Sequence, residues 1–135
     1  MARDAVPLSD TWGAMEGLVE QGLARQIGVC NYNTGLLHDL MSYARIRPAM
    51  LQIESHPYLT QDALIRTAQD YGMAVTAFSP LGASSYLELD MATQQESVLG
   101  ERVIADIAQE YGVSVAQVVL RWGLQRNTAV IPKTS

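Results

Sequence analysis

The chain has 135 residues, of which 48% are hydrophobic, and this is enough material for one compact domain spanning residues 1–135. Its net charge is −5 and its nine lysines and arginines are scattered, so the sequence predicts no surface for nucleic acid or an anionic membrane. No apolar run reaches the roughly 18 residues of a membrane span. The start lacks a signal peptide's apolar core, and the single cysteine cannot form an internal disulfide. We therefore expect a soluble cytoplasmic protein.

The first part of the chain alternates helical patterns with short apolar runs. Residues 9–21 have helical spacing, with Ser9 and Asp10 as start signals and Gly22 as a stop. Residues 24–30 are a short apolar run without polar alternation, which is typical of a strand buried on both faces of a parallel sheet. The same pair of patterns recurs twice, as a helix over 34–44 before a strand over 49–54 and a helix over 60–72 before a strand over 73–78.

The second part of the chain departs from this alternation once. Residues 79–100 contain serine and glycine without a clear period, and we interpret them as a functional loop. Helices are then predicted from about Glu101 to Gly112 and after the capping box Ser114–Gln117, before a last strand at 129–131. This order predicts a parallel α/β sheet, either open and doubly wound or closed into a barrel.

Functional side chains in either architecture gather at the carboxyl ends of the strands. Each predicted strand here ends in polar or aromatic residues, namely Cys30 and Asn31; Gln52, Glu54 and His56; Phe78 and Ser79; and Lys133, Thr134 and Ser135. Amides can hold a carboxamide, an aromatic ring can stack on a heterocycle, and an ammonium can neutralise phosphate. The strand ends therefore suit a nucleotide or coenzyme.

Structural interpretations of the same residues remain open. Asn31 can simply form a turn, and the Gln52 side chain can be hydrogen-bonded within the protein. Phe78 can belong to the hydrophobic core, and Cys30 can be a small buried hydrophobic residue. Lys133 can be a solvent-exposed residue at the end of the chain. His56 and Glu54 offer too few ligands for a metal, which favours a structural histidine and no metal site. The motifs GxGxxG, GxxxxGK[ST] and GxSxG do not occur.

The stretches RQIGVCNYN, LQIESHPYL, AVTAFSPLG and AVIPKTS resemble, in this order and spacing, successive strand-end motifs of the aldo-keto reductases. The segments before the first and last motifs also resemble the corresponding segments of that family, so the resemblance covers nearly the whole chain. Its nearest members are the xylose-reductase and aldose-reductase-like enzymes. The resemblance implies a parallel (βα) half-barrel of about four strands with flanking helices, a fragment of a TIM (βα)₈ barrel. It also implies an oxidoreductase that reduces aldehydes and ketones with NADPH.

The resemblance assigns the strand ends to an NADPH site. Asn31 and Gln52 match the positions that hold the nicotinamide carboxamide, Cys30 stands where the family usually has serine, and Phe78 matches the aromatic position that stacks on the nicotinamide. The loop along the pyrophosphate is matched by Ser79, Pro80, Leu81 and Gly82. The 2′-phosphate positions are matched by Lys133 and Thr134.

The departures from the family concern catalysis. The family's Asp, Tyr, Lys and His tetrad lies on earlier strands that have no counterpart here, so no catalytic residue is assigned. The pair His56-Pro57 follows a later strand and does not replace the tetrad histidine. We expect the chain alone to be inactive, because an absent general acid costs on the order of 10²–10⁴ in rate. The alternative is a non-enzymatic half-barrel that self-associates and keeps a residual dinucleotide or phosphate site.

Four strands of a barrel leave two open edges and an uncovered interior. Burial of this apolar surface predicts a homodimer or larger assembly, or association with a complementary half-barrel.

Overall fold

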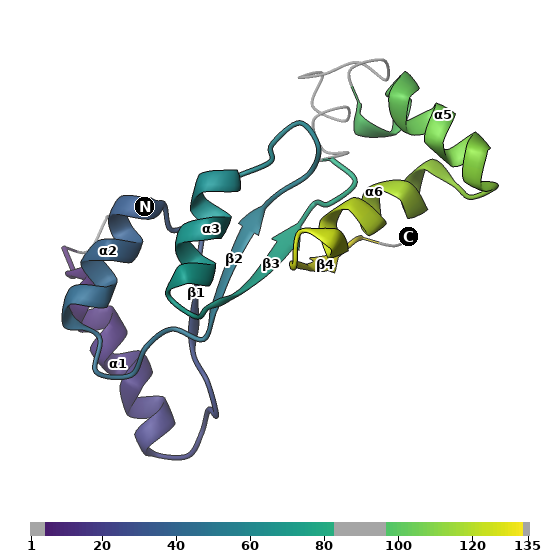
Figure 1. Ribbon diagram of the computed structural model, residues 1–135. Coiled ribbons are helices and arrows are strands. Elements are labelled where there is room, and N and C mark those ends of the chain that lie inside the picture. Colours follow the sequence, from purple (N-terminus) through teal and green to yellow (C-terminus); the bar gives the residue numbers. More distant parts are fainter. Residues whose placement is uncertain (1–4, 83–96, 134–135) are drawn as a thin grey trace.

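The computed structural model describes residues 5–82 and 97–133. Its strands are β1 (Gly28–Cys30), β2 (Met50–Glu54), β3 (Ala74–Phe78) and β4 (Ala129–Ile131). Its helices are α1 (Leu8–Glu20), α2 (Thr34–Tyr43), α3 (Asp62–Asp70), the 3-10 turn η2 (Val98–Gly100), α5 (Arg102–Tyr111) and α6 (Val115–Gln125) (Figure 1). The predicted alternation of helices and strands is confirmed.

The four strands form one parallel sheet in the order β1-β2-β3-β4. A doubly wound sheet reverses its strand order at a switch point, whereas a barrel adds each strand beside the previous one. The order observed here has no reversal, as expected for part of a barrel wall. It therefore favours the barrel among the two architectures that the sequence left open.

Side-chain caps set the starts of α2 and α6. The Asn33 side chain accepts a hydrogen bond from the Leu36 amide at 2.9 Å, which caps α2. The Ser114–Gln117 capping box at α6 is confirmed, with both reciprocal hydrogen bonds present. Helix α1 begins at Leu8, one residue before the expected signal, and no side chain caps it.

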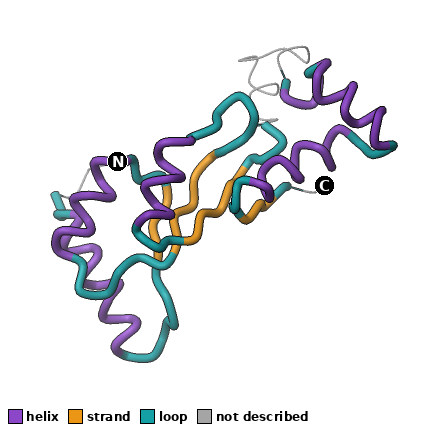
Figure 2. Tube along the Cα trace, viewed as in Figure 1, coloured by secondary structure: helices purple, strands orange, loops and turns teal. Residues whose placement is uncertain are grey.

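The face of the sheet that lies under the helices holds the largest hydrophobic cluster. Leu51, Ile53 and Val75 are at most 2% exposed and pack with Leu37 of α2 and Ile65 of α3. Figure 2 shows α3 running along the sheet beside the strands. Because β-strand side chains alternate between faces, only every second strand residue joins this core.

None of the helices in the described residues covers the opposite face of the sheet (Figure 1). Met50 and Ile131 are 41% and 47% exposed, and Ala74 and Ala129 are also exposed. The expectation that the strands are buried on both faces is therefore wrong for this chain. An apolar run predicts that side chains on both faces of the strand are buried. It does not specify that the atoms burying them belong to these 135 residues.

A buried carboxylate joins α1 to the turn after α2. The Glu16 carboxylate accepts hydrogen bonds from the backbone amides of Ile46 at 2.9 Å and Arg45 at 2.7 Å, and it also binds the Arg45 guanidinium. The Ile46 amide is the main cause that lowers the pKa of Glu16, and Arg45 lowers it further against the opposing effect of burial. This contact fixes α1 to the segment between α2 and β2.

Among the described residues, no single helix has the length and apolar composition of a membrane span. The helices α5 and α6 satisfy those criteria only as a pair, with a 97° bend between them.

Candidate functional site

The carboxyl ends of the four parallel strands meet along one edge of the sheet. Cys30 lies opposite Gln52, while Glu54 lies opposite Phe78, which lies opposite Ile131. All five positions alternate with the helix-covered residues, so they belong to the uncovered face. The structure thus brings three candidate residues from three separate segments, Cys30, Gln52 and Phe78, to the same edge and face.

Cys30 is exposed, so its interpretation as a small buried hydrophobe is wrong. The thiol lies at the last position of an edge strand and on the uncovered face, where no helix can bury it. The next residue, Asn31, has a left-handed backbone with φ of 58°, a conformation that asparagine tolerates better than most residues. The backbone N–H of Asn31 donates to the backbone carbonyl of Gln52 at 2.9 Å, which extends the β1–β2 pairing by one residue.

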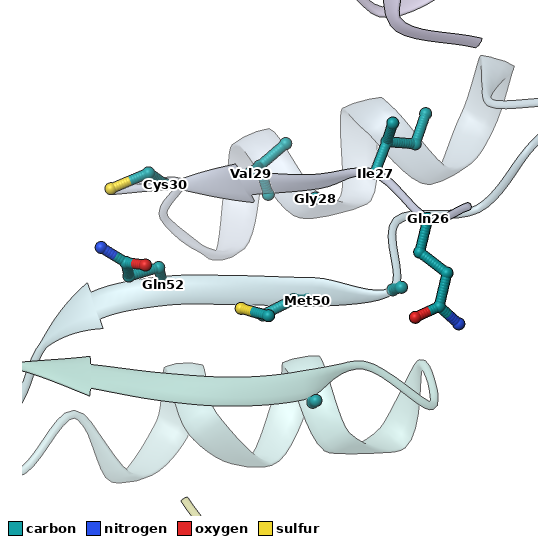
Figure 3. Close-up of a pocket in the computed structure, with 9 residues that line it drawn as sticks. Gln26, Ile27, Gly28, Val29, Cys30, Met50 and Gln52 are labelled. Atoms are coloured by element: carbon teal, nitrogen blue, oxygen red, sulfur yellow. The ribbon is translucent and has the colours of Figure 1, made fainter. Parts of the chain in front are cut away.

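The Gln52 amide is half-buried and makes no side-chain hydrogen bond within the described part of the chain. Figure 3 shows this amide and the Cys30 sulfur at the same end of β2 and β1. Both residues line a pocket of about 350 Å³ that continues along the uncovered face past Met50 to Gly28. A Cβ atom at Gly28 would lie 2.6 Å from the Met50 carbonyl oxygen, so glycine allows this close strand approach.

A tight turn follows Phe78 at the end of β3. The Gly82 amide donates to the Ser79 carbonyl at 2.9 Å, and both residues have positive φ, 48° at Ser79 and 81° at Gly82. Pro80 is buried, and Leu81 packs on the hydrophobic cluster of Val98, Ile104 and Val119. A Cβ at Gly82 would lie only 3.2 Å from the Val98 side chain. The turn is therefore fixed against η2 and the helices that follow it.

Lys133 is exposed two residues after β4, and it is the only lysine in the sequence. No ion pair holds its ammonium within the described residues, which leaves the charge available to an anion. Thr134, its predicted neighbour in the phosphate site, lies outside the described residues.

The strand leading to Lys133 is placed by α6. Gly123 of that helix packs directly on Val130, because a Cβ at Gly123 would lie 2.8 Å from the Val130 Cγ1 atom. The Thr128 hydroxyl also donates to the Gly123 carbonyl at 2.8 Å.

His56 is buried at the carboxyl edge, with its Nε2 atom 3.2 Å from the Glu54 Oε1 atom. Its Nδ1 atom is buried without a hydrogen-bond partner among the described residues. No cluster of three or more His, Cys, Asp or Glu side chains in the described ranges has the arrangement of a metal site.

Sequence reasoning missed Glu101 as a partner of this edge. The Tyr58 hydroxyl donates to its Oε2 atom at 2.7 Å, which joins the loop after β2 to the start of α5. This hydrogen bond is the main cause that raises the pKa of Tyr58, with desolvation a smaller one. The two residues lie 43 positions apart, so no local pattern could have paired them.

Comparison with known families gives a match over residues 3–135 to the aldo/keto reductase family. Two curated relatives are the probable NAD(P)H-dependent D-xylose reductases of Neosartorya fischeri and Aspergillus fumigatus. Each is 54% identical to this chain over 130 residues, or 95% of it. The chain spans only 40% and 41% of their respective lengths.

Solved structures also match this chain over part of their length. The aldose reductase from Schistosoma japonicum superimposes with a TM-score of 0.84 and 37% identity, and that from Giardia lamblia with 0.84 and 41%. Each match covers 97% of this chain but only 39% and 42% of the respective reductase. The four-stranded sheet therefore corresponds to part of a larger reductase barrel.

Proposed function

The chain belongs to the aldo/keto reductase family, and we propose that it forms the NADPH-binding part of an aldehyde or ketone reductase. The observation that carries this proposal is the Gln52 amide, which is half-buried beside Cys30 and has unused hydrogen-bonding capacity. A nicotinamide carboxamide has one donor group and one acceptor, and a side-chain amide complements both.

The other residues of the edge fit the remaining parts of the same cofactor. Phe78 offers an aromatic face on the same side of the sheet as Gln52, where the nicotinamide can stack. The turn from Ser79 to Gly82 offers backbone to a pyrophosphate. Lys133 offers an unpaired ammonium to a 2′-phosphate. In this assignment Asn31 assists Gln52, and Thr134 assists Lys133.

When bound, NADPH supplies the hydride that reduces the carbonyl carbon. This chain would bind and orient the cofactor, but among the residues that the structure describes, neither Tyr58 nor His56 is a suitable proton donor for the carbonyl oxygen. The Tyr58 hydroxyl donates to Glu101 and has a raised pKa, which makes it a weaker acid. His56 is buried against Glu54. We therefore propose that the 135-residue chain alone does not reduce carbonyl substrates. We also propose that it acts in the cytoplasm.

Calorimetric titration with NADPH tests the binding proposal. We expect micromolar affinity for the wild type and about a tenfold loss in Lys133→Ala, because a charge-assisted contact to phosphate is removed. Arg25→Ala is the matched control, since it removes an exposed cation before the amino end of β1. NADH, which lacks the 2′-phosphate, should bind the wild type and Lys133→Ala equally. No binding at millimolar NADPH contradicts the proposal.

Chemical labelling provides a second and independent readout. Cys30 is the only cysteine and Lys133 the only lysine, and they lie at the two predicted ends of the cofactor. Mass spectrometry should show that NADPH slows alkylation of Cys30 and acylation of Lys133 together. Protection of Lys133 alone would indicate a phosphate site without a nicotinamide site. NADPH oxidation with xylose or glyceraldehyde should stay at the background rate.

A second candidate function is a non-enzymatic, self-associating half-barrel that keeps a residual phosphate or dinucleotide site. The exposed apolar side chains of Met50 and Ile131 favour it, because they lie on a face that needs a partner. Failure of NADPH to bind, together with a stable assembly of the chain, would support this candidate over the first.

A further inference from the structure

The uncovered face of the sheet is a continuous surface defined by strand register. Three rows of residues face away from the helices, each row running across the strands in register. They are Gly28, Met50 and Ala74; Cys30, Gln52, Thr76 and Ala129; and Glu54, Phe78 and Ile131. We call these ten positions the open face.

The open face is more exposed than the helix-covered one, apart from Thr76, which is 7% exposed. Met50 is 41% exposed and Ile131 is 47% exposed. Leu51 and Ile53, which point to the helix-covered face, are at most 2% exposed. Parallel sheets are normally covered on both faces. Burial of large apolar side chains contributes roughly 1.5–3 kcal/mol each, so an association that covers this face is favourable.

The two edges of the sheet are also available for pairing. Within the described residues, β1 pairs only with β2 and β4 pairs only with β3. Both edge strands are three residues long, and all four strands run in the same direction. A two-fold axis parallel to the strands would place β4 of one protomer beside β1 of its partner in parallel orientation. This closes a ring of eight strands, the number that a TIM barrel uses.

Charge favours association through this face over other surfaces. The chain has a net charge of −5, so most approaches of two copies bring like charges together. The open face carries one charged residue among its ten positions, Glu54, and that carboxylate already contacts His56 at 3.2 Å. Two copies therefore meet little electrostatic repulsion across the open face.

We propose that two copies of this 135-residue chain associate through their open faces, with β4 of each pairing with β1 of the other. The proposal does not depend on the cofactor, since Met50 and Ala74 lie in the row farthest from the carboxyl edge. Its failure would leave the NADPH proposal unaffected.

A second exposed apolar surface supplies the matched control. Leu99, Val103, Ile107 and Tyr111 recur every fourth residue along η2 and α5 and are 38–71% exposed. This stripe lacks an adjoining open strand edge, so we do not expect it to form the dimer. Val103→Glu changes this stripe, while Met50→Glu and Ala74→Glu change the open face.

Light scattering on purified protein at micromolar concentration tests the proposal. The wild type and Val103→Glu should have a mass close to twice 14.8 kDa. Met50→Glu and Ala74→Glu should dissociate at least about 100-fold more readily, because each buried carboxylate would lack a partner. Circular dichroism should show that these variants remain folded, since both residues are exposed in the single chain.

Cys30 gives a readout that does not rely on any variant. Its thiol is exposed in one copy and lies on the open face, so its reaction with a thiol reagent should slow as protein concentration rises, without NADPH. A wild-type mass of one chain overturns the proposal and indicates that another partner, such as the remainder of a barrel, covers this face. Assemblies larger than two, or dissociation by Val103→Glu with Met50→Glu unaffected, also overturn it.

Discussion

Substitution of Gly123 tests how tightly α6 fixes the strand that leads to Lys133. An alanine Cβ at this position would lie 2.8 Å from the Val130 Cγ1 atom, whereas carbon atoms in contact lie roughly 3.5–4.0 Å apart. Helix and strand would have to separate by about 0.7 Å or more. Val130 cannot yield easily, because a β-branched side chain has few χ1 options. Overpacking of this kind costs about 1–3 kcal/mol.

The helix propensity of alanine partly offsets that cost, and a matched variant removes this complication. Gly13 lies in α1, is exposed, and has no atom within 4 Å of the place that an alanine methyl would take, so Gly13→Ala should stabilise the protein by about 0.5–1 kcal/mol. The same propensity gain applies at Gly123. The difference between the two variants in free energy of unfolding should therefore equal the overpacking cost, about 1–3 kcal/mol.

Urea denaturation at one fixed protein concentration measures these values, since the proposed self-association would make stability depend on concentration. A double-mutant cycle with Val130→Ala removes the opposing methyl, so Gly123→Ala should cost less in that background. Gly123→Ala should also weaken NADPH binding more than Gly13→Ala, because β4 leads directly to Lys133. Equal stabilisation by both alanines, or no coupling to Val130, would refute the packing argument.

Two further predictions concern acidic side chains. The pKa of Glu16 lies below its ordinary value of 4.5, so its contribution to stability is present above pH 4.5 and is lost as the pH falls further. Glu16→Gln should be less stable at pH 7 and should show a smaller drop in melting temperature on acidification; parallel pH profiles would contradict this. Removing the carboxylate in Glu101→Gln should lower the pKa of Tyr58 toward 10.0. Ultraviolet difference titration with Tyr58→Phe as the blank measures it, and an unchanged phenol titration would argue against the hydrogen bond.

The alternation of elements could be predicted because its signals are local. The Ser114–Gln117 capping box and the short apolar runs each lie within one segment, and they determine α6 and the strands. The strand ends could be predicted as neighbours because parallel strands bring their carboxyl ends to one edge. The lengths were less accurate: the run over 24–30 yields only the three-residue β1, because pairing with β2 begins at Gly28.

Contacts between distant segments could not be predicted. An apolar residue such as Met50 gives the same sequence pattern whether or not the chain contains the surface that covers it. The exposure of Cys30 follows from the same limitation, since its burial depends on what lies across the face rather than on its neighbours. The hydrogen bond from Tyr58 to Glu101 depends on where the start of α5 lies, and no periodicity specifies that position.

The two proposals share Cys30, Gln52 and Phe78 but approach the open face from different sides, so both can hold. In a closed barrel the side chains of successive layers fill the interior, and ligands bind above them at the carboxyl edge. A dimer that buries the row of Met50 and Ala74 would form such a floor, while Asn31 and Lys133, which follow the strands, would stay accessible above it. Gln52 lies in the row between Met50 and Ala74 on one side and the residues that follow the strands on the other. Its side-chain amide would therefore lose water in the dimer and still face the carboxyl edge. Association would then strengthen the hydrogen bonds that Gln52 offers to a carboxamide, because such bonds gain strength where water is excluded.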